Sequence, residues 1–89
     1  MDGLECTFWN VGQGLFSSGK VSLDNNKEFI WVYDCGTSSS QKLLSSCISK
    51  MKREYPNEYI DLLAISHFDK DHISGIKELL KNYKIKQKL

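Results

Sequence analysis

The 89-residue sequence predicts an α+β fold in which helices pack on a mixed β-sheet. Two observations support this. Three segments of strand character come first, and two segments with helical spacing of apolar residues follow, separated by one more short apolar strand, which gives the order β-β-β-α-β-α. The composition, with 40% hydrophobic and 26% charged residues, is that of a globular chain and excludes intrinsic disorder.

Three predicted strands open the chain and form an antiparallel meander. Residues 4–11 alternate apolar and polar side chains and are rich in Thr, Phe, Trp and Val. Gly12-Gln13-Gly14 ends that pattern, and residues 15–23 form the second strand. A turn signal at residues 24–27 leads into a third strand, residues 28–34, which is β-branched and aromatic.

The first helix is predicted after Cys35-Gly36, where the period of apolar residues changes. Ser38 and Gln41 have the spacing of a capping box, with Ser38 at the cap position. Apolar residues then recur every three or four positions, and the helix is expected to end near Glu54.

The last third of the chain predicts one strand, one helix and the start of another strand. Residues 60–65 are a short apolar strand interrupted by Asp61. A second amphipathic helix follows from Ile73 to Tyr83. Residues 84–89 have the composition to begin a further strand.

Length and composition predict a single domain, residues 1–89, with a thin core. No apolar run approaches the roughly 20 residues of a membrane helix, and the acidic first five residues do not form a signal peptide. The three cysteines are odd in number and lack a C-x-x-C pair, which argues against a disulfide scaffold. We therefore expect a cytoplasmic protein in which Cys6 and Cys47 are small buried hydrophobic residues.

The net charge of +1 is distributed unevenly. Residues 1–40 hold two lysines and five carboxylates, whereas the last thirteen residues hold five lysines. This basic end could attract a phosphate-bearing partner, or it could be a solvated helix face with a frayed end.

One short segment gathers the chain's candidate metal ligands. Both histidines and two aspartates fall within six positions, on a predicted loop between a strand and a helix: His67, Asp69, Asp71 and His72. In extended backbone the first three would project on one side, and the fourth would point away from them and could reach a second ion. Mixed imidazole and carboxylate ligands suit zinc, manganese or iron. Asp71 alone could simply cap the next helix, but four such residues at this spacing favour a metal site.

The segment 66–75, Ser-His-Phe-Asp-Lys-Asp-His-Ile-Ser-Gly, resembles the central metal motif of the metallo-β-lactamase superfamily. Asp69 stands where most members have a second histidine, a variant known in the branch that resembles the nuclease-like domain of the DNA-uptake protein ComEC. Residues 8–14, Phe-Trp-Asn-Val-Gly-Gln-Gly, are similar to the segment that opens this branch, and residues 33–36 match the superfamily's Asp-x-Gly.

The resemblance implies the N-terminal half of an αββα sandwich and a metal-dependent hydrolase, with a phosphodiester such as nucleic acid as substrate. It implies up to two zinc ions, with manganese as the alternative. His67 and Asp69 would bind the first ion, and Asp71 and His72 the second. Asp71 would also be catalytic, because it would orient the attacking water or move its proton.

The resemblance also implies supporting roles outside the ligand segment. Asp34 would hydrogen-bond the metal-binding segment without ligating the metal. Gly12, Gln13 and Gly14 would form a loop at the rim of the site, where glycine permits close backbone approach. Gly75 would let the start of the second helix pack closely beneath the metal-binding segment.

Two features depart from the family pattern. Leu15-Phe16 follows the glycine loop where the ComEC-like branch has Asp-Ala or similar. The later His, bridging Asp and final His of the superfamily have no counterpart after His72, and four side chains cannot give two metals three ligands each. We therefore expect a domain that is incomplete alone and needs a complementing polypeptide. The alternatives are a non-catalytic assembly module, whose open sheet is covered by a homo-oligomer, and, with less support, a nucleic-acid-binding fragment.

Overall fold

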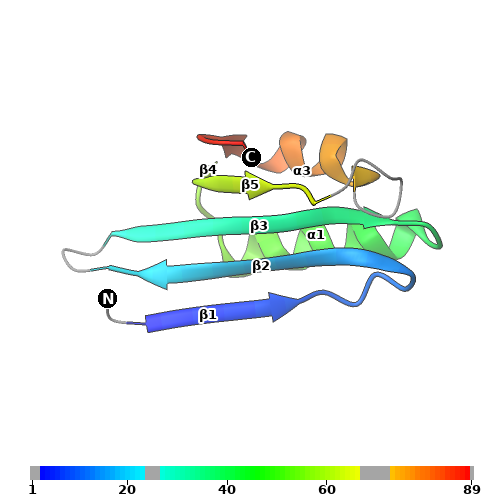
Figure 1. The fold of residues 1–89 in the computed structure, drawn as a ribbon, viewed down its shortest axis with the longest axis horizontal. Coiled ribbons are helices and arrows are strands. Elements are labelled where there is room, and N and C mark those ends of the chain that lie inside the picture. The colour runs from blue at the N-terminus through cyan, green and yellow to red at the C-terminus, as the bar shows by residue number, and fades with distance from the viewer. Residues whose placement is uncertain (1–2, 24–26, 67–72, 89) are drawn as a thin grey trace.

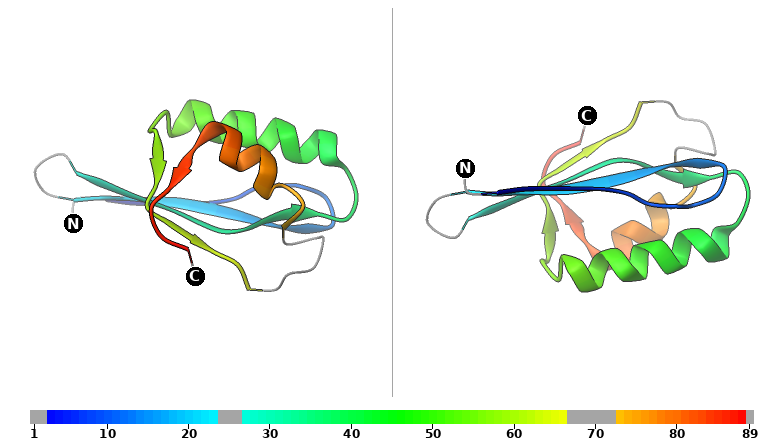
Figure 2. Two further views of the ribbon diagram at one scale, coloured as in Figure 1. Left: turned by 90° about the horizontal axis from the view of Figure 1, so that it is seen from above. Right: turned by 90° about the horizontal axis from the view of Figure 1, so that it is seen from below.

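Four strands form a twisted sheet, and the helices of the described residues lie on one face of it (Figures 1 and 2). The computed structural model describes residues 3–23, 27–66 and 73–88. The strand order is β1-β2-β3-β5, with antiparallel pairing except between β3 and β5. These strands are β1 (Gly3–Phe8), β2 (Gly14–Ser22), β3 (Glu28–Thr37) and β5 (Leu62–Ala64). The predicted α+β class and mixed sheet are confirmed.

Asp61 divides the predicted strand 60–65 into two strands of different sheets. Its N–H donates to the Ile30 carbonyl at 2.8 Å, and its Oδ2 accepts the Ile30 N–H at 2.8 Å. Before it, β4 (Tyr59–Ile60) pairs in parallel with β6 (Lys84–Ile85), while β5 after it joins the main sheet. The further strand expected near the end of the chain is therefore present as β6.

Helix α1 (Gln41–Glu54) packs its apolar side chains against the main sheet. Its cap is Ser40, whose hydroxyl accepts the Leu43 N–H at 3.1 Å, so the predicted cap at Ser38 is wrong. The Ser38 hydroxyl instead donates to the Gln13 carbonyl at 3.1 Å, in the loop between β1 and β2. Ser38 therefore does not cap the helix, because its hydroxyl is engaged by a residue distant in sequence.

Helix α3 (Ile76–Asn82) is shorter than the predicted helix 73–83, because it begins after Gly75. The end of α3 is joined to the end of α1 by Lys52, whose Nζ donates to the carbonyls of Asn57 at 2.6 Å and Asn82 at 2.8 Å. The same ammonium lies 4.2 Å from the centre of the Tyr83 ring, a cation–π contact.

The core lies between the helices and the face of the sheet that they cover. It is built from the buried side chains Val11, Phe16, Ile30, Val32, Cys35, Leu44, Cys47, Ile48, Met51, Tyr55, Ile60, Leu63, Leu79 and Tyr83. Cys47 is buried as predicted, but Cys6 is exposed, because it projects from β1 on the face away from the helices. Neither helix in the described ranges has the length and apolar character that crossing a membrane requires.

Candidate functional site

The four predicted ligands, His67, Asp69, Asp71 and His72, lie outside the described residues. Within the described ranges no group of three or more His, Cys, Asp and Glu side chains could hold a metal ion. Both histidines of the chain are in the segment 67–72, so a site with imidazole ligands must use that segment. The residues on either side of the segment are described, and they show where its two ends are attached.

Asp34 holds the residue that precedes the segment. Its carboxylate is fully buried, and Oδ1 accepts the Ser66 N–H at 2.8 Å while Oδ2 accepts the Ser66 hydroxyl at 2.7 Å. Two hydrogen bonds from one residue to one carboxylate fix both the backbone and the side chain of Ser66. Asp34 is therefore joined to the start of the ligand segment, while its role toward a metal stays a prediction.

A β-bulge places this carboxylate. On β2 and β3, Ser17 pairs with Tyr33 and Phe16 with Cys35, so Asp34 is the extra residue on β3. Its φ of 60° is in the left-handed region, which aspartate tolerates better than most residues. The predicted strand ended at Asp34, but β3 continues through the bulge to Thr37.

The residues after the segment are fixed to the same end of β3. The Ser74 hydroxyl accepts the Thr37 N–H at 2.7 Å and donates to the Thr37 carbonyl at 3.0 Å. The Gly75 N–H donates to the Cys35 carbonyl at 2.9 Å. The attachment points on both sides of the segment therefore lie within residues 34–37 of one strand.

Gly75 fits this place because it has no side chain. A Cβ there would lie 2.6 Å from Leu44 Cδ2 and 2.9 Å from Cys35 Sγ. The start of α3 therefore packs against both α1 and β3, while its packing beneath the ligand segment stays a prediction.

The glycine loop lies at the same end of the sheet. Gly12 has a φ of 78°, and a Cβ there would clash with the Ser39 hydroxyl. The Thr37 hydroxyl donates to the Val11 carbonyl at 2.6 Å, and the Gln13 N–H donates to Ser39 Oγ at 3.2 Å. A Cβ on Gly14 would clash with the backbone of β3. The predicted rim residues Gly12, Gln13 and Gly14 are thus brought beside the attachment points of the ligand segment.

Cys35, although adjacent to Asp34, is a buried thiol of the core. Burial raises the pKa of its thiol to about 12, with a further contribution from the Glu78 carboxylate. The thiol is therefore neutral at physiological pH. Glu78 itself accepts a hydrogen bond from the Ser45 hydroxyl at 2.8 Å, which ties α3 to α1.

Sequence reasoning gave no role to Ser66, Ser74 or Thr37, which make the attachments. Their position in the sequence could have indicated such a role, because a serine lies close to each side of the ligand segment. Their partners are more than 30 residues away, and only the fold brings them together.

Comparison with known proteins finds similar sequences among bacterial ribonucleases. Ribonuclease Z of Listeria innocua is 30% identical over 83 residues, which cover 86% of this chain and 25% of that protein. Ribonuclease Z of Listeria welshimeri and ribonuclease BN of Proteus mirabilis are each 29% identical with the same coverage. The chain spans about a quarter of the length of these curated relatives. No solved structure gives a significant match.

The family model described as the metallo-beta-lactamase superfamily matches residues 23–89. This range includes the strand that carries Asp34, the whole ligand segment and Gly75. Because the match covers well over half of the sequence, the chain belongs to the metallo-β-lactamase superfamily.

Proposed function

We propose that the chain is the metal-binding part of a metal-dependent hydrolase that cleaves phosphodiester bonds in nucleic acid. The observation that carries the proposal is the attachment of Ser66 and of Ser74-Gly75 to the end of β3. These attachments bracket the four ligand-type side chains and leave the segment between them for a metal site. Superfamily membership and relatives named as ribonucleases support the choice of reaction and substrate.

The donor set fits zinc, with manganese as the alternative. Two imidazoles and two carboxylates are ligands that zinc and manganese accept, whereas calcium and magnesium prefer oxygen ligands alone. His67 and Asp69 would hold one ion, and Asp71 and His72 a second. When bound, such an ion lowers the pKa of a coordinated water to about 7 and so supplies hydroxide near neutral pH.

The protein's own groups would position the reactants and move the proton. Asp71 would orient the attacking water and accept its proton. Asp34 would keep the start of the segment in place through Ser66, a supporting interaction of the kind that changes metal affinity or activity about 10–100-fold. The loop Gly12-Gln13-Gly14 would border the substrate at the same end of the sheet.

We further propose that full activity needs donors from outside these 89 residues. Two metal ions with three protein ligands each need more than the four side chains of this segment. The similarity of residues 8–14 to the ComEC-like branch and the names of the curated relatives both favour nucleic acid as the substrate. Three free cysteines agree with a reducing compartment, and we propose the cytoplasm.

The basic end of the chain is a weaker candidate for nucleic-acid contact. Lys84 pairs with Glu58 at 2.9 Å, and Lys86 pairs with Asp61 at 3.4 Å. These carboxylates neutralise part of the positive charge that the sequence places there, so we give priority to the ligand segment.

Metal titration of the purified chain tests the proposal. We expect zinc or manganese binding by calorimetry, with an affinity at least about 10-fold lower in His67→Ala, and about 10–100-fold lower in Asp34→Asn. Lys70→Ala is the matched control, because it shortens a side chain of the same segment that cannot ligate as a carboxylate or imidazole. Absence of binding, or equal affinity in wild type and His67→Ala, would refute the proposal. Oligonucleotide cleavage by the isolated chain would contradict the need for further donors.

A further inference from the structure

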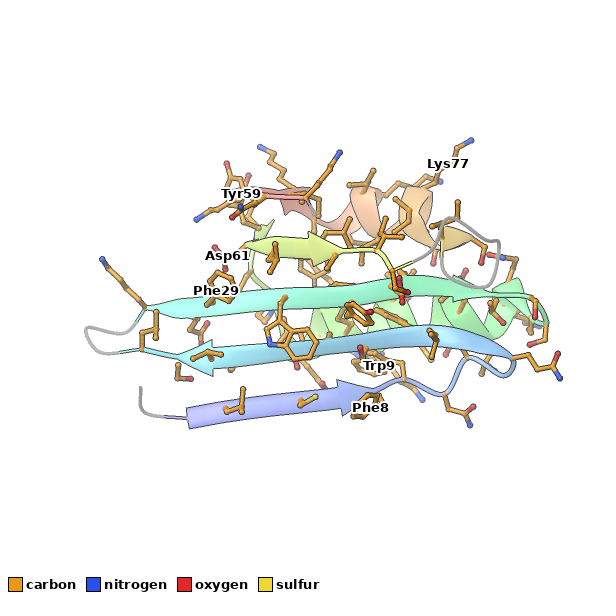
Figure 3. The ribbon with its side chains drawn as sticks, in the orientation of Figure 1. Phe8, Trp9, Phe29, Tyr59, Asp61 and Lys77 are labelled. Atoms are coloured by element: carbon orange, nitrogen blue, oxygen red, sulfur yellow. The ribbon has the colours of Figure 1, made fainter. Side chains whose placement is uncertain are left out.

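Strand β1 forms one edge of the main sheet, and Phe8 marks its end (Figures 1 and 3). At the opposite edge, the Leu63 N–H of β5 donates to the Gln87 carbonyl at 2.9 Å, and Leu63 forms a parallel bridge with Lys88. Among the described residues no strand pairs with the outer side of β1. Helices α1 and α3 both contact β3, two strands away from this edge. The edge at β1 is therefore uncovered within the described part of the chain.

Every second residue of β1 directs its backbone N–H and C=O groups toward this outer side. The Trp9 N–H donates to the Phe16 carbonyl at 2.8 Å, which identifies these two as a hydrogen-bonded pair between the strands. Hydrogen-bonded and non-hydrogen-bonded pairs alternate along an antiparallel ladder, so Thr7, like Trp9, bonds to β2. The β1 residues whose backbone groups face outward are therefore Leu4, Cys6 and Phe8.

This edge lacks the features that commonly protect an edge strand from pairing. Residues 3–8 contain neither lysine nor proline, and their register with β2 is regular, without a bulge. The charged residue of the strand, Glu5, forms an ion pair of 3.6 Å with Lys20 of the same chain. Leu4 and Phe8 are 63% and 83% exposed. A regular edge strand of this kind is a template for another strand.

We propose that β1 pairs with β1 of a second copy of the chain, antiparallel and about a two-fold axis, so that the two main sheets become one continuous sheet. Outward-facing residues of the two copies must lie opposite each other to form hydrogen-bonded pairs. One register brings all of them together. In it Leu4 lies opposite Phe8 of the second copy, Cys6 opposite Cys6, and Phe8 opposite Leu4.

The second copy is favoured as the partner because the strand is complementary to itself in this register, as a two-fold interface requires. Each hydrogen-bonded pair exchanges two N–H···O bonds. Leu4 and Phe8 form an apolar cross-strand pair, and Glu5 lies opposite Thr7, so no like charges face each other. The axis is perpendicular to the sheet, and the helices of both copies therefore stay on one side. The face of the sheet opposite the helices is not used by this contact.

The mass of the chain in solution, measured by sedimentation over a concentration series, tests the dimer. We expect twice the 10.2 kDa of one chain. Cys6→Pro removes an outward N–H, which an edge strand tolerates, and should weaken association at least about 10-fold. Cys6→Ser is the matched control, because it keeps the N–H, and its dimer should be unchanged. Circular dichroism checks folding, and Leu4→Pro with Leu4→Ser replaces this pair if Cys6→Pro does not fold.

A third variant separates pairing at the edge from association through the face of the sheet opposite the helices. Tyr33 is 45% exposed and lies on β3, a central strand, so Tyr33→Lys changes that face without changing the backbone of β1. If the contact is the β1 edge, Tyr33→Lys should associate as the wild type does.

Cross-linking tests the register. Cys6 is exposed, whereas Cys35 and Cys47 are buried. In a hydrogen-bonded antiparallel pair the two Cα atoms are about 5.5 Å apart, within the range of about 4.4–6.8 Å that a disulfide spans. Diamide, a two-electron oxidant, should therefore take two electrons and two protons from the Cys6 thiols of the two copies and join them by a disulfide, which a non-reducing gel detects.

Two further variants make the register test specific. In Cys6→Ser chains, Leu4→Cys and Phe8→Cys should each give little cross-linked dimer alone, because neither position lies opposite itself. A mixture of the two variants should cross-link, because Leu4 lies opposite Phe8 of the second copy. Cross-linking of each variant alone, without preference for the mixture, would refute the register.

Three results would overturn the dimer itself. A chain that is monomeric at every concentration would exclude it. Equal association of Cys6→Pro and wild type would place the contact away from the β1 backbone, and a loss in Tyr33→Lys as large as that in Cys6→Pro would assign it to the face of the sheet. The proposal does not depend on the hydrolase function, since a dimer that binds no metal supports it equally.

Discussion

Replacing Gly75 by alanine tests whether the start of α3 is packed as tightly as the structure indicates. The added Cβ would lie 2.6 Å from Leu44 Cδ2 and 2.9 Å from Cys35 Sγ, closer than real Cβ contacts allow. Leu44 is 1% exposed and Cys35 is fully buried, so neither can move aside into solvent. The φ of −97° at Gly75 suits alanine, so the expected effect comes from crowding alone.

The expected cost is that of overpacking a core, about 1–3 kcal/mol in the free energy of unfolding. In a domain of this size each kcal/mol lowers the melting temperature by roughly 4–8 °C. Urea unfolding followed by the fluorescence of Trp9 and Trp31 measures the change. Gly3→Ala is the control, because the atoms nearest to a Cβ there are 4.0 Å away, and its effect should be within about 0.5 kcal/mol.

A double-mutant cycle identifies the clash. Leu44→Ala alone should cost about 2–5 kcal/mol, because it leaves a cavity in the core. In Gly75→Ala/Leu44→Ala the new methyl group has room, so the double variant should lose at least about 1 kcal/mol less than the two single losses added together. Wild-type stability in Gly75→Ala, or additive losses in the cycle, would refute the packing argument.

Two further predictions concern stability. The free energy of unfolding should fall above pH 9. The Cys35 thiol has an ordinary pKa of 9.0 in the unfolded chain, and burial raises its pKa to about 12 in the folded chain. Rising pH therefore favours the unfolded chain, by about 1 kcal/mol at pH 10. Urea unfolding across pH should show a smaller loss in Cys35→Ala, and an equal loss would contradict this assignment. Ser40→Ala should cost about 1 kcal/mol through loss of the α1 cap, whereas an equal cost in Ser38→Ala would restore the capping box predicted from sequence.

The sequence predicted the elements whose pattern is local. Residues 41–54 repeat apolar side chains with helical period and form α1 as expected. The start of that helix could not be assigned in the same way, because Ser38, Ser39 and Ser40 are equivalent as local caps. Ser38 and Ser39 interact with the loop near Gln13, which leaves Ser40 to cap the helix.

The bulge at Asp34, at the candidate site, is a second feature that local sequence patterns did not predict. An aspartate followed by Cys-Gly has the local signature of a strand end, and the third strand was predicted to stop there. In the structure the buried carboxylate is satisfied by Ser66, 32 residues later, so β3 continues to Thr37. The prediction that Cys6 is buried was wrong because it also depended on distant parts of the chain. Alternation of apolar and polar residues in β1 shows that its two faces differ, but it does not show which face the helices cover.

The face of the main sheet opposite the helices ends beside the ligand segment. Tyr33 of β3 pairs with Ala64 of β5, and both residues lie on that face. Tyr33 directly precedes Asp34, and Ala64 lies two residues before Ser66, so this pair borders the attachment of the ligand segment. A polypeptide that covered this face would lie beside the ligand segment, where the proposed metal site needs further donors.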